Sequence, residues 1–354
     1  MIFSTVLTRR AGLLALAIAL GFGFAGCQPS DNDRDKTVII YSYDSLSGDL
    51  VDAIAAHMQG EHGLQVEIQR PGDTGALFTQ LLLEKQAPVA DVVIGLDESY
   101  LPRLKAEKML AAYQPATLQL LRPELLIDED YEAIPFDFGY ITVNADADGL
   151  DGAAADSLLA DGSASWGDLL HPDLRSSFIM LNPGTSSPGR NFLLFTIAVF
   201  GEDGYLDFWR SLKPNILTVS SGWSDGYGLY AQGEAPLVVS YETSPAYHRH
   251  FEETERYRAV LLDGAAYMQV ELAGIVNGAP NREGAQLVMD YLVSPEFQSL
   301  IPLNQFMYPV HPQAELPASF GDGASAIKAV RLEPEYVEEN FAAWLTEWED
   351  VIGQ

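Results

Sequence analysis

The feature that most constrains this chain is an alternation of short, β-branched apolar runs with longer amphipathic stretches. Residues 37–42 form such a run, and residues 50–58 follow with helical spacing. Residues 64–68 and 91–95 are two more strand candidates, separated by a helical pattern over 73–85. Strands that alternate with helices form βαβ units, in which a parallel sheet is covered on both faces. The pattern therefore predicts an α/β fold.

The alternation is interrupted once, near the middle of the chain. Residues 138–144 are typical of a strand, and Ala, Asp and Gly then dominate residues 145–165. A crossing strand followed by low complexity indicates passage into a second lobe, and residues 267–276 are the strand expected to return. Because 354 residues exceed what one core usually holds, we predict two lobes with a ligand cleft at their junction. The predicted units are lobe 1 (37–143 and 277–354), lobe 2 (144–276) and hinge strands at about 138–144 and 267–276.

The last stretch of the chain has the spacing of an amphipathic helix. Its large apolar residues recur on one helical face and are Phe341, Trp344, Leu345, Trp348 and Ile352. We predict that this face packs on a core and does not bind a ligand.

The amino terminus has the three regions of a secretory signal. The first ten residues carry two arginines and no acid, residues 12–20 are apolar, and small residues precede Cys27. The apolar run is too short to be read as a transmembrane helix. We expect residues 1–26 to be a signal peptide.

The residues around Cys27 resemble the lipobox at which bacterial lipoproteins are cleaved and acylated. We therefore expect lipidation of Cys27, with residues 27–36 as a polar tether; an ordinary signal with an incidental cysteine is the alternative. Gln28 follows the cysteine where an aspartate would favour the inner membrane. The expected location is the periplasm, with the lipid anchored in the outer membrane.

Composition excludes several function classes. The formal net charge of −30 argues against a protein that tracks nucleic-acid phosphates. With one cysteine in the chain, disulfides, zinc–thiolate sites and a cysteine nucleophile beside a lipid anchor are all excluded. The sequence shows neither a Walker loop nor a metalloprotease histidine pair, and the dinucleotide-like match at 21–26 lies in the signal. We expect no enzyme, no metal and no cofactor.

Two aromatic segments carry the chemistry of a binding site. Residues 222–228 read GWSDGYG and residues 240–247 read SYETSPAY. Large rings among small hydroxyl residues and glycines suit a flat, charged small molecule, because the rings offer π-faces and the small residues let backbone donors approach. Core packing is the alternative for each ring.

Two serine–proline pairs predict helix starts near this site. Ser187 and Ser244 are candidate caps, each followed by a proline at the first helical position, so that hydroxyls and amides can face a polar ligand. Tyr241 ends an apolar strand at the end expected to face the cleft. His248 and His250 lie two residues apart and are expected to be solvated.

These segments resemble the thiamine-binding periplasmic proteins of ABC importers. The similarity runs from about Val38 to about Trp348, and Gly-Trp-Ser and Ser-Tyr-x-Thr-Ser-Pro-Ala-Tyr are its most specific motifs. The resemblance implies a monomeric receptor of the type II periplasmic binding-protein fold. Such a receptor closes on thiamine, in some members on its phosphates, and delivers it to the permease in the inner membrane. The segments that carry the resemblance are 41–45, 91–97, 134–140, 218–229, 240–248 and 304–310.

The resemblance also implies the residues of the site. By motif, Trp223 and Tyr247 would stack on the ligand rings, and Tyr241 would line the pocket. Glu242 replaces a threonine of the family, which adds a carboxylate that would suit a cation and disfavour phosphate esters. Phe306 and Leu50 stand where the family can carry tryptophan. The full predicted set is Tyr43, Asp44, Asp73, Thr74, Ser186, Ser187, Trp223, Tyr241, Glu242, Thr243, Ser244, Pro245, Tyr247 and Phe306.

Two other functions remain open from the residues. A receptor of the same fold could take ferric iron held by tyrosines, or a polyamine held by rings and carboxylates. Tyr241 and Tyr247 are six residues apart, whereas iron sites of such receptors use adjacent tyrosines. An enzyme that degrades thiamine on this fold would need a cysteine nucleophile, and Cys27 is assigned to the anchor.

Overall fold

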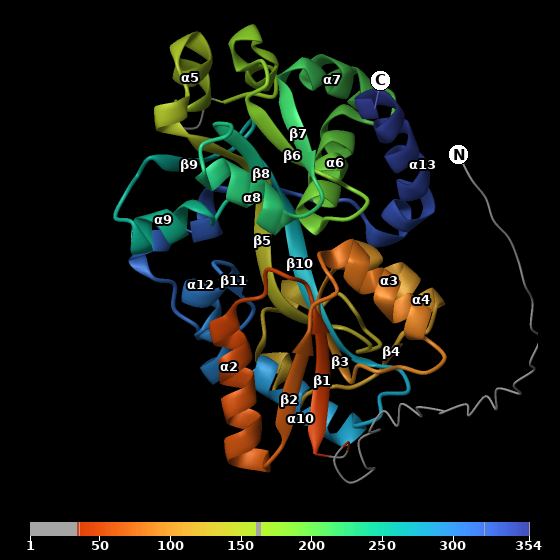
Figure 1. Cartoon of the computed structure of the whole chain (residues 1–354). Coiled ribbons are helices and arrows are strands. Elements are labelled where there is room, and N and C mark those ends of the chain that lie inside the picture. The colour runs from red at the N-terminus through yellow and green to blue at the C-terminus, as the bar shows by residue number, and fades with distance from the viewer. Residues whose placement is uncertain (1–33, 35, 161–163, 322, 354) are drawn as a thin grey trace, which may run out of the picture.

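The computed structural model describes residues 34, 36–160, 164–321 and 323–353. Two α/β lobes lie one above the other in Figure 1, with lobe 1 at the bottom and lobe 2 at the top. The predicted signal peptide, Cys27, Gln28 and most of the predicted tether lie outside the described residues.

One continuous sheet runs through both lobes. Its main path is β2-β1-β3-β10-β5-β8-β6-β7, with β4 and β12 paired to β10, and β9 and β11 paired to β5. The strands are β1 (Thr37–Ser42), β2 (Gln65–Gln69), β3 (Val92–Asp97), β4 (Leu110–Ala111), β5 (Ile134–Asp146), β6 (Phe178–Leu181), β7 (Ile216–Ser220), β8 (Leu237–Tyr241), β9 (Tyr257–Val260), β10 (Ala265–Val276), β11 (Tyr308–Pro309) and β12 (Lys328–Val330).

The sheet is mixed, whereas the alternation predicted a parallel one. In lobe 1, β1 is parallel to β2 and β3, and in lobe 2, β6 is parallel to β7 and β8. The long strand β5 leaves lobe 1 and β10 returns to it, so these two strands run antiparallel to each other. β10 is also antiparallel to β3, and β5 to β8. The strand that crosses and the strand that returns must oppose each other, which the local pattern does not show.

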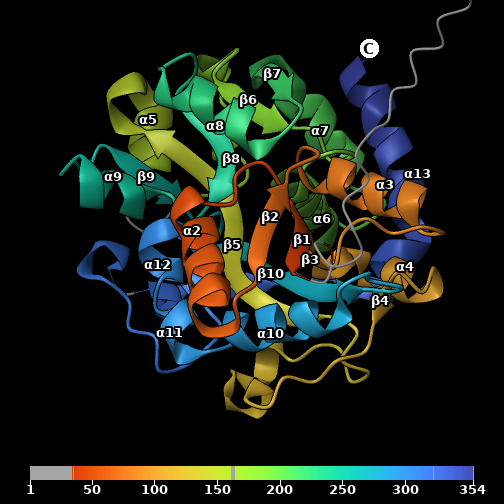
Figure 2. The same cartoon turned by 60° about the horizontal axis from the view of Figure 1, so that its bottom comes forward.

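Helices cover the sheet on both sides. In lobe 1, α2 lies on one side of β1, and α3 and α4 lie on the other; Figure 2 brings α2 and α10 to the front. Among the described helices, none has the length and apolar composition needed to cross a bilayer. The helices are α2 (Gly48–His57), α3 (Thr74–Glu84), α4 (Leu101–Ala106), α5 (Gly152–Leu158), α6 (Ser187–Phe200), α7 (Tyr205–Leu212), α8 (Trp223–Ala231), α9 (Pro245–Phe251), α10 (Arg282–Leu292), α11 (Pro295–Gln298), α12 (Ile301–Asn304) and α13 (Pro334–Gly353).

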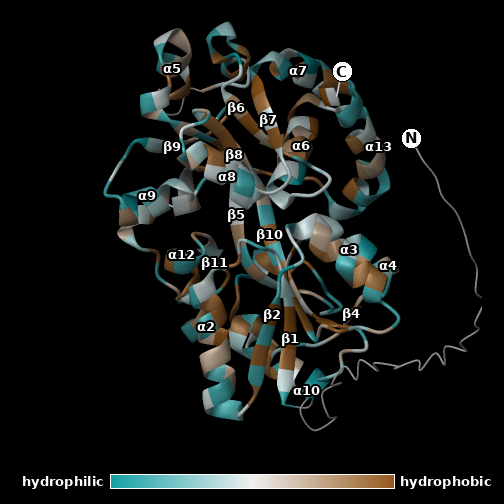
Figure 3. Cartoon of the chain, in the orientation of Figure 1, coloured by the Kyte–Doolittle hydropathy of each residue, from teal (hydrophilic) through white to brown (hydrophobic). Residues whose placement is uncertain are grey.

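Each lobe has its own apolar core, and α13 joins the core of lobe 2. Phe341, Trp344 and Trp348 pack in that core, and Trp348 meets Trp209 of α7 edge to face at 5.6 Å. Figure 3 shows β6 and β7 as largely apolar strands next to helices of mixed hydropathy. The predicted core packing of this helix face is thus observed, but in lobe 2, whereas 277–354 was assigned to lobe 1. The apolar face predicts that a helix packs, not which lobe receives it.

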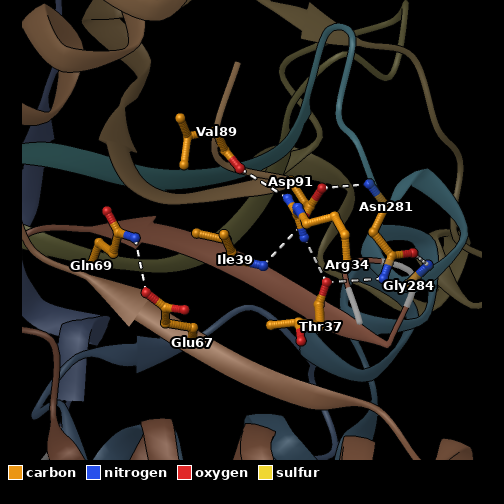
Figure 4. Close-up of polar contacts among 9 residues, drawn as sticks. All are labelled: Arg34, Thr37, Ile39, Glu67, Gln69, Val89, Asp91, Asn281 and Gly284. Carbon is orange, nitrogen blue, oxygen red and sulfur yellow. Dashed lines mark hydrogen bonds and ion pairs between the residues drawn. The ribbon is translucent and has the colours of Figure 1, made fainter. Parts of the chain in front are cut away.

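A buried carboxylate connects three elements of lobe 1 at the end of the lobe away from lobe 2. Figure 4 shows its contacts. Asp91 accepts hydrogen bonds from the backbone of Ile39 at 2.8 Å and of Asn281 at 2.7 Å, so it connects β1, β3 and the start of α10. Arg34 forms an ion pair with Asp91 at 2.8 Å and donates to the carbonyl of Val89 at 2.9 Å. Arg34 belongs to the predicted polar tether, and these contacts attach it to lobe 1.

Candidate functional site

A cavity of about 540 Å³ lies between the lobes, at the carboxyl ends of strands from both. This volume falls in the range of small-molecule sites, and clefts between α/β lobes are where such sites usually lie. Its lining includes no lysine or arginine among the described residues. The lining residues are Tyr43, Ser45, Ser47, Asp73, Thr74, Ser187, Pro188, Trp223, Ser224, Tyr227, Gly228, Ala231, Tyr241, Ser244, Tyr247, His248, Glu252, Glu271, Asn304, Gln305, Phe306 and Met307.

Two stacked rings of α8 form one wall of the cavity, here called the aromatic wall (Trp223 and Tyr227). The rings lie 4.9 Å apart at 18°, because residues four apart share one helix face. The indole Nε1 of Trp223 donates to Ser240 Oγ at 2.9 Å, and Ser240 hydrogen-bonds to Ser244 at 2.7 Å. The end of β8 and the start of α9 thus hold the indole in place.

A buried histidine supports the aromatic wall. The Tyr227 hydroxyl hydrogen-bonds to His248 Nε2 at 2.9 Å, and His248 Nδ1 bonds to Glu252 at 2.7 Å. His248 is buried and contributes to the lining, so its predicted solvation is wrong. Their spacing predicts that His248 and His250 lie on different faces of a helix. It does not predict which of these faces is buried.

Rings from both lobes meet at the mouth of the cavity. Tyr247 of α9 lies edge to face with Phe306 of lobe 1, with ring centroids 5.3 Å apart. Tyr247 is 41% exposed, so it is not a core residue. Phe306 has a φ of 56°, a left-handed conformation that is costly for an aromatic residue and that recurs at binding sites.

Asp73 connects the two lobes through the starts of two helices. Its Oδ1 caps α3 by accepting from Thr74 N at 2.6 Å, and its Oδ2 accepts from Trp223 N, the first residue of α8, at 2.9 Å. Burial raises the pKa of Asp73, and these two backbone hydrogen bonds oppose the rise. One carboxylate therefore serves two helix N-termini from different lobes, which requires the lobes to be together.

The lobes also touch at a glycine. Gly75 N donates to the carbonyl of Thr185 at 2.9 Å, and a Cβ on Gly75 would lie 2.8 Å from the carbonyl oxygen of Gly184. Nearby, Ser224 Oγ donates to Asp44 at 3.1 Å across the same gap. The structure thus has the closed arrangement of the two lobes.

A buried glutamate forms the floor of the cavity together with two tyrosines. Glu271 of β10 accepts from the hydroxyls of Tyr43 at 2.7 Å and Tyr241 at 3.1 Å. Burial raises the pKa of Glu271 to about 7, and the two tyrosine hydrogen bonds oppose that rise. The sequence analysis missed this residue, although a glutamate inside the apolar run at 267–276 was a usable signal.

The structure brings most of the predicted site residues to the cavity. Those in its lining are Tyr43, Asp73, Thr74, Ser187, Trp223, Tyr241, Ser244, Tyr247 and Phe306.

The other five predicted residues lie outside the lining. Asp44 is exposed to solvent. Ser186, Thr243 and Pro245 are buried but do not contribute to the lining. Glu242 instead accepts a hydrogen bond from Tyr308 at 2.8 Å. Successive side chains of a strand point to opposite faces, so Glu242 turns from the cavity that Tyr241 faces.

The predicted helix starts are close to those observed. α9 begins at Pro245 with Ser244 at the cap position, but the Ser244 hydroxyl bonds to Ser240 and does not cap the helix. α6 begins one residue earlier than predicted, with Ser186 at the cap position and Ser187 as the first helical residue. Ser187 donates instead to Asp97 of lobe 1, which adds a further contact between the lobes.

Comparisons with known proteins agree with this geometry. Residues 87–328 match the family of bacterial extracellular solute-binding proteins. The thiamine-binding periplasmic proteins of Brucella abortus and Salmonella typhimurium are 30% and 31% identical, over 95% and 89% of this chain and 98% and 93% of theirs. A solved periplasmic thiamin-binding protein is 30% identical with a TM-score of 0.81, over 90% of this chain and 96% of that one. Ferric ion-binding structures at 17% identity share the fold alone. The chain is therefore a two-lobed periplasmic binding protein that belongs to the bacterial extracellular solute-binding proteins and, among them, to the thiamine-binding periplasmic proteins.

Proposed function

We propose that this protein captures thiamine between its lobes and presents it to an ABC importer. The observation that carries the proposal is the pairing of the aromatic wall with the acidic floor, Glu271, in a cavity whose described lining holds no lysine or arginine. Thiamine is flat and bears a fixed positive charge on its thiazolium ring. A desolvated cation–π contact contributes about 2 kcal/mol of the roughly 12 kcal/mol that nanomolar binding needs.

The remaining binding energy has sources on both lobes. The carboxylates of Asp73 and Glu271 line the cavity, and charge pairing strengthens when closure excludes water. The side chains of Ser187, Ser244 and Gln305 also line the cavity, and each has one or more protein partners and keeps further hydrogen-bonding capacity for the polar edge of the ligand. A preformed cleft of this kind lowers the entropic cost of binding.

The site is less suited to ferric iron. Iron-binding tyrosines must lose their protons, but burial, followed by the charge of Glu271, raises the pKa of both Tyr43 and Tyr241 well above the usual value. Both hydroxyls donate to Glu271. In the part of the chain that the structure describes, there is no group of three His, Cys, Asp or Glu that could hold a metal ion.

The rest of the proposal concerns location and chemistry. We infer a monomeric receptor that binds without turnover or cofactor and is held in the outer membrane by a lipid on Cys27. Mass spectrometry of the protein from membranes should find an acylated amino-terminal cysteine, and sucrose-gradient fractions should place it with outer-membrane markers.

Calorimetry tests the proposed ligand directly. Purified protein should bind thiamine with submicromolar affinity and should give no comparable signal with spermidine or ferric citrate. Tight binding of spermidine with weak binding of thiamine would instead assign the cavity to polyamines. Release of pyrimidine and thiazole products would assign it to an enzyme.

Thiamine should also close the protein. The hydrogen bond from Trp223 N to Asp73 joins the lobes only when they are together, and ligand that contacts both lobes favours that arrangement. Small-angle scattering should show a fall in the radius of gyration when thiamine is added. The variant Gly75→Leu is the matched control; an equal fall in that variant, or none in the wild type, would contradict ligand-driven closure.

Free thiamine should be preferred over its diphosphate by about tenfold or more. The lining offers carboxylates and, among the described residues, no lysine or arginine, so a phosphate group meets like charge in a poorly solvated cleft. Glu242→Thr should change this ratio by no more than about twofold, because Glu242 faces Tyr308 and not the cavity. Competition titrations with both ligands measure the ratio. If Glu242→Thr abolished the preference for free thiamine, Glu242 would have to be part of the binding site.

A further inference from the structure

Three carboxylates stand side by side beneath the cavity. β10 lies between β3 and β5, and Glu271 is the register partner of Asp97 on one side and of Asp137 on the other. Residues directly opposite each other in antiparallel strands have Cβ atoms about 5 Å apart. All three side chains are buried, and Glu271 alone of the three contributes to the cavity lining.

The three carboxylates differ in their hydrogen bonds. Asp97 accepts from Ser99 N at 2.9 Å and from the hydroxyl of Ser187. Glu271 accepts from its two tyrosines and from Gln269 Nε2 at 3.1 Å. Neither oxygen of Asp137 has a hydrogen-bond partner within the part of the chain that the structure describes.

Among the described residues, no Lys, Arg or His forms an ion pair with Asp97, Asp137 or Glu271. Arg190 of α6 donates to Ser99 and lies over the ring of Phe341. Adjacent ionised carboxylates without a counter-charge cannot both persist in a dry interior, so the pair of Asp137 and Glu271 retains a proton.

The other elements packed around the row bring acids, tyrosines, two arginines and uncharged residues. β11 faces Asp137 with Pro309, which does not titrate, and α12 is followed by the uncharged Gln305, which donates to Tyr43. The titratable groups that act on Glu271 are Tyr43 after β1, Asp73 at the start of α3, Asp97 at the end of β3 and Tyr241 of β8. Glu98, which follows Asp97, is influenced in turn by Arg331 after β12, and Arg190 of α6 donates to Ser99.

We propose that Asp137 and Glu271 share a proton in the empty protein and release it to solvent when a cation enters the cavity. The ligand's positive charge then takes the place of the proton beside Glu271. The inference rests on the proposed function in so far as it takes the ligand to be an organic cation. It makes Glu271 a residue that selects for charge, and it couples ligand capture to the acidity of the medium.

The electrostatics of the pair agree with this exchange. Burial, together with the charge of Glu271, holds the pKa of Asp137 well above its usual range, and burial raises that of Glu271 to about 7. A bound cation lowers the pKa of Glu271, so the ligand and the proton compete. Below about pH 7 each unit of acidification should weaken binding by up to tenfold, and above that pH the affinity should level off.

Calorimetry at pH 6.0 in three buffers of different ionisation enthalpy measures the released protons. The wild type should release close to one proton per thiamine at pH 6.0 and close to none at pH 8.5. Asp137→Asn removes one acid of the pair but not the burial of Glu271, so the release should fall below one proton and the affinity at pH 6.0 should rise toward its pH 8.5 value. Glu271→Gln should abolish the release, with weaker binding at both pH values.

His248→Gln is the matched control, because His248 also lines the cavity but belongs to α9 and lies outside the row of carboxylates. This variant should keep the release of one proton. Loss of the release in His248→Gln, or its persistence in both carboxylate variants, would overturn the proposal. So would a wild-type affinity that is flat from pH 5.5 to 8.5, a result that leaves thiamine binding itself intact. Absence of thiamine binding at every pH would instead refute the proposed function, and with it the ligand of this exchange.

Discussion

Gly75→Leu is expected to weaken thiamine binding by about 100-fold without lowering the melting temperature. A Cβ at this position would lie 2.8 Å from backbone atoms of Gly184 and Thr185, which belong to the other lobe. Backbone cannot move aside as a flexible side chain does, so the larger residue opposes closure by about 3 kcal/mol. Gly75 lies in the first turn of α3, where leucine is the better helix former, so the folded lobe itself is not weakened.

Calorimetry with thiamine and a thermal melt of the empty protein measure the two effects. Gly60→Leu is the matched control, because Gly60 is also in a helical turn of lobe 1 but a Cβ there meets nothing within 4 Å. That control should bind thiamine as the wild type does. Wild-type affinity in Gly75→Leu would show that the ligand does not need the lobe contact.

Trp223→Ala should weaken thiamine binding by 1 to 3 kcal/mol, or about 5- to 150-fold, and should leave folding nearly intact. The indole stacks on Tyr227 at the cavity surface and its ring is only partly buried, so the loss falls on the ligand more than on the core. The backbone amide that donates to Asp73 remains in the variant, which separates stacking from lobe contact.

Trp223→Phe is the conservative comparison. It keeps a ring over the ligand and loses the hydrogen bond to Ser240, so its affinity should fall between those of the wild type and the alanine variant. Calorimetry and circular dichroism melts decide between the two roles. Unchanged affinity with a large drop in melting temperature would make Trp223 a core residue.

Local motifs predicted part of the lobe 2 side of the cavity. A few consecutive residues are enough to predict a strand end or a helix start. Such positions are Tyr241 at the end of β8, Ser244 before α9 and Trp223 at the start of α8. Alternation of side chains along an extended segment could also have predicted that Glu242 points away from the cavity if Tyr241 points into it.

The floor of the cavity could not be predicted in the same way. Asp97, Asp137 and Glu271 become neighbours only because β10 inserts between β3 and β5, and no local pattern encodes that pairing. The same holds for α13, whose apolar face is plain in the sequence while its place in the core of lobe 2 depends on α7. Tertiary pairing decides such contacts, and it lies beyond any window of consecutive residues.

The central position of β10 also sets the order in which the protein can acquire its structure. As the chain emerges from the ribosome, β1, β2, β3 and β5 appear more than a hundred residues before β10. β10 is the strand that must lie between β3 and β5. Until residues 265–276 arrive, lobe 1 has an open sheet edge and cannot complete its core. Pairings this distant in sequence make for late and slow folding. The nascent chain is thereby kept extended for longer, which is the condition in which a polypeptide can be threaded across a membrane.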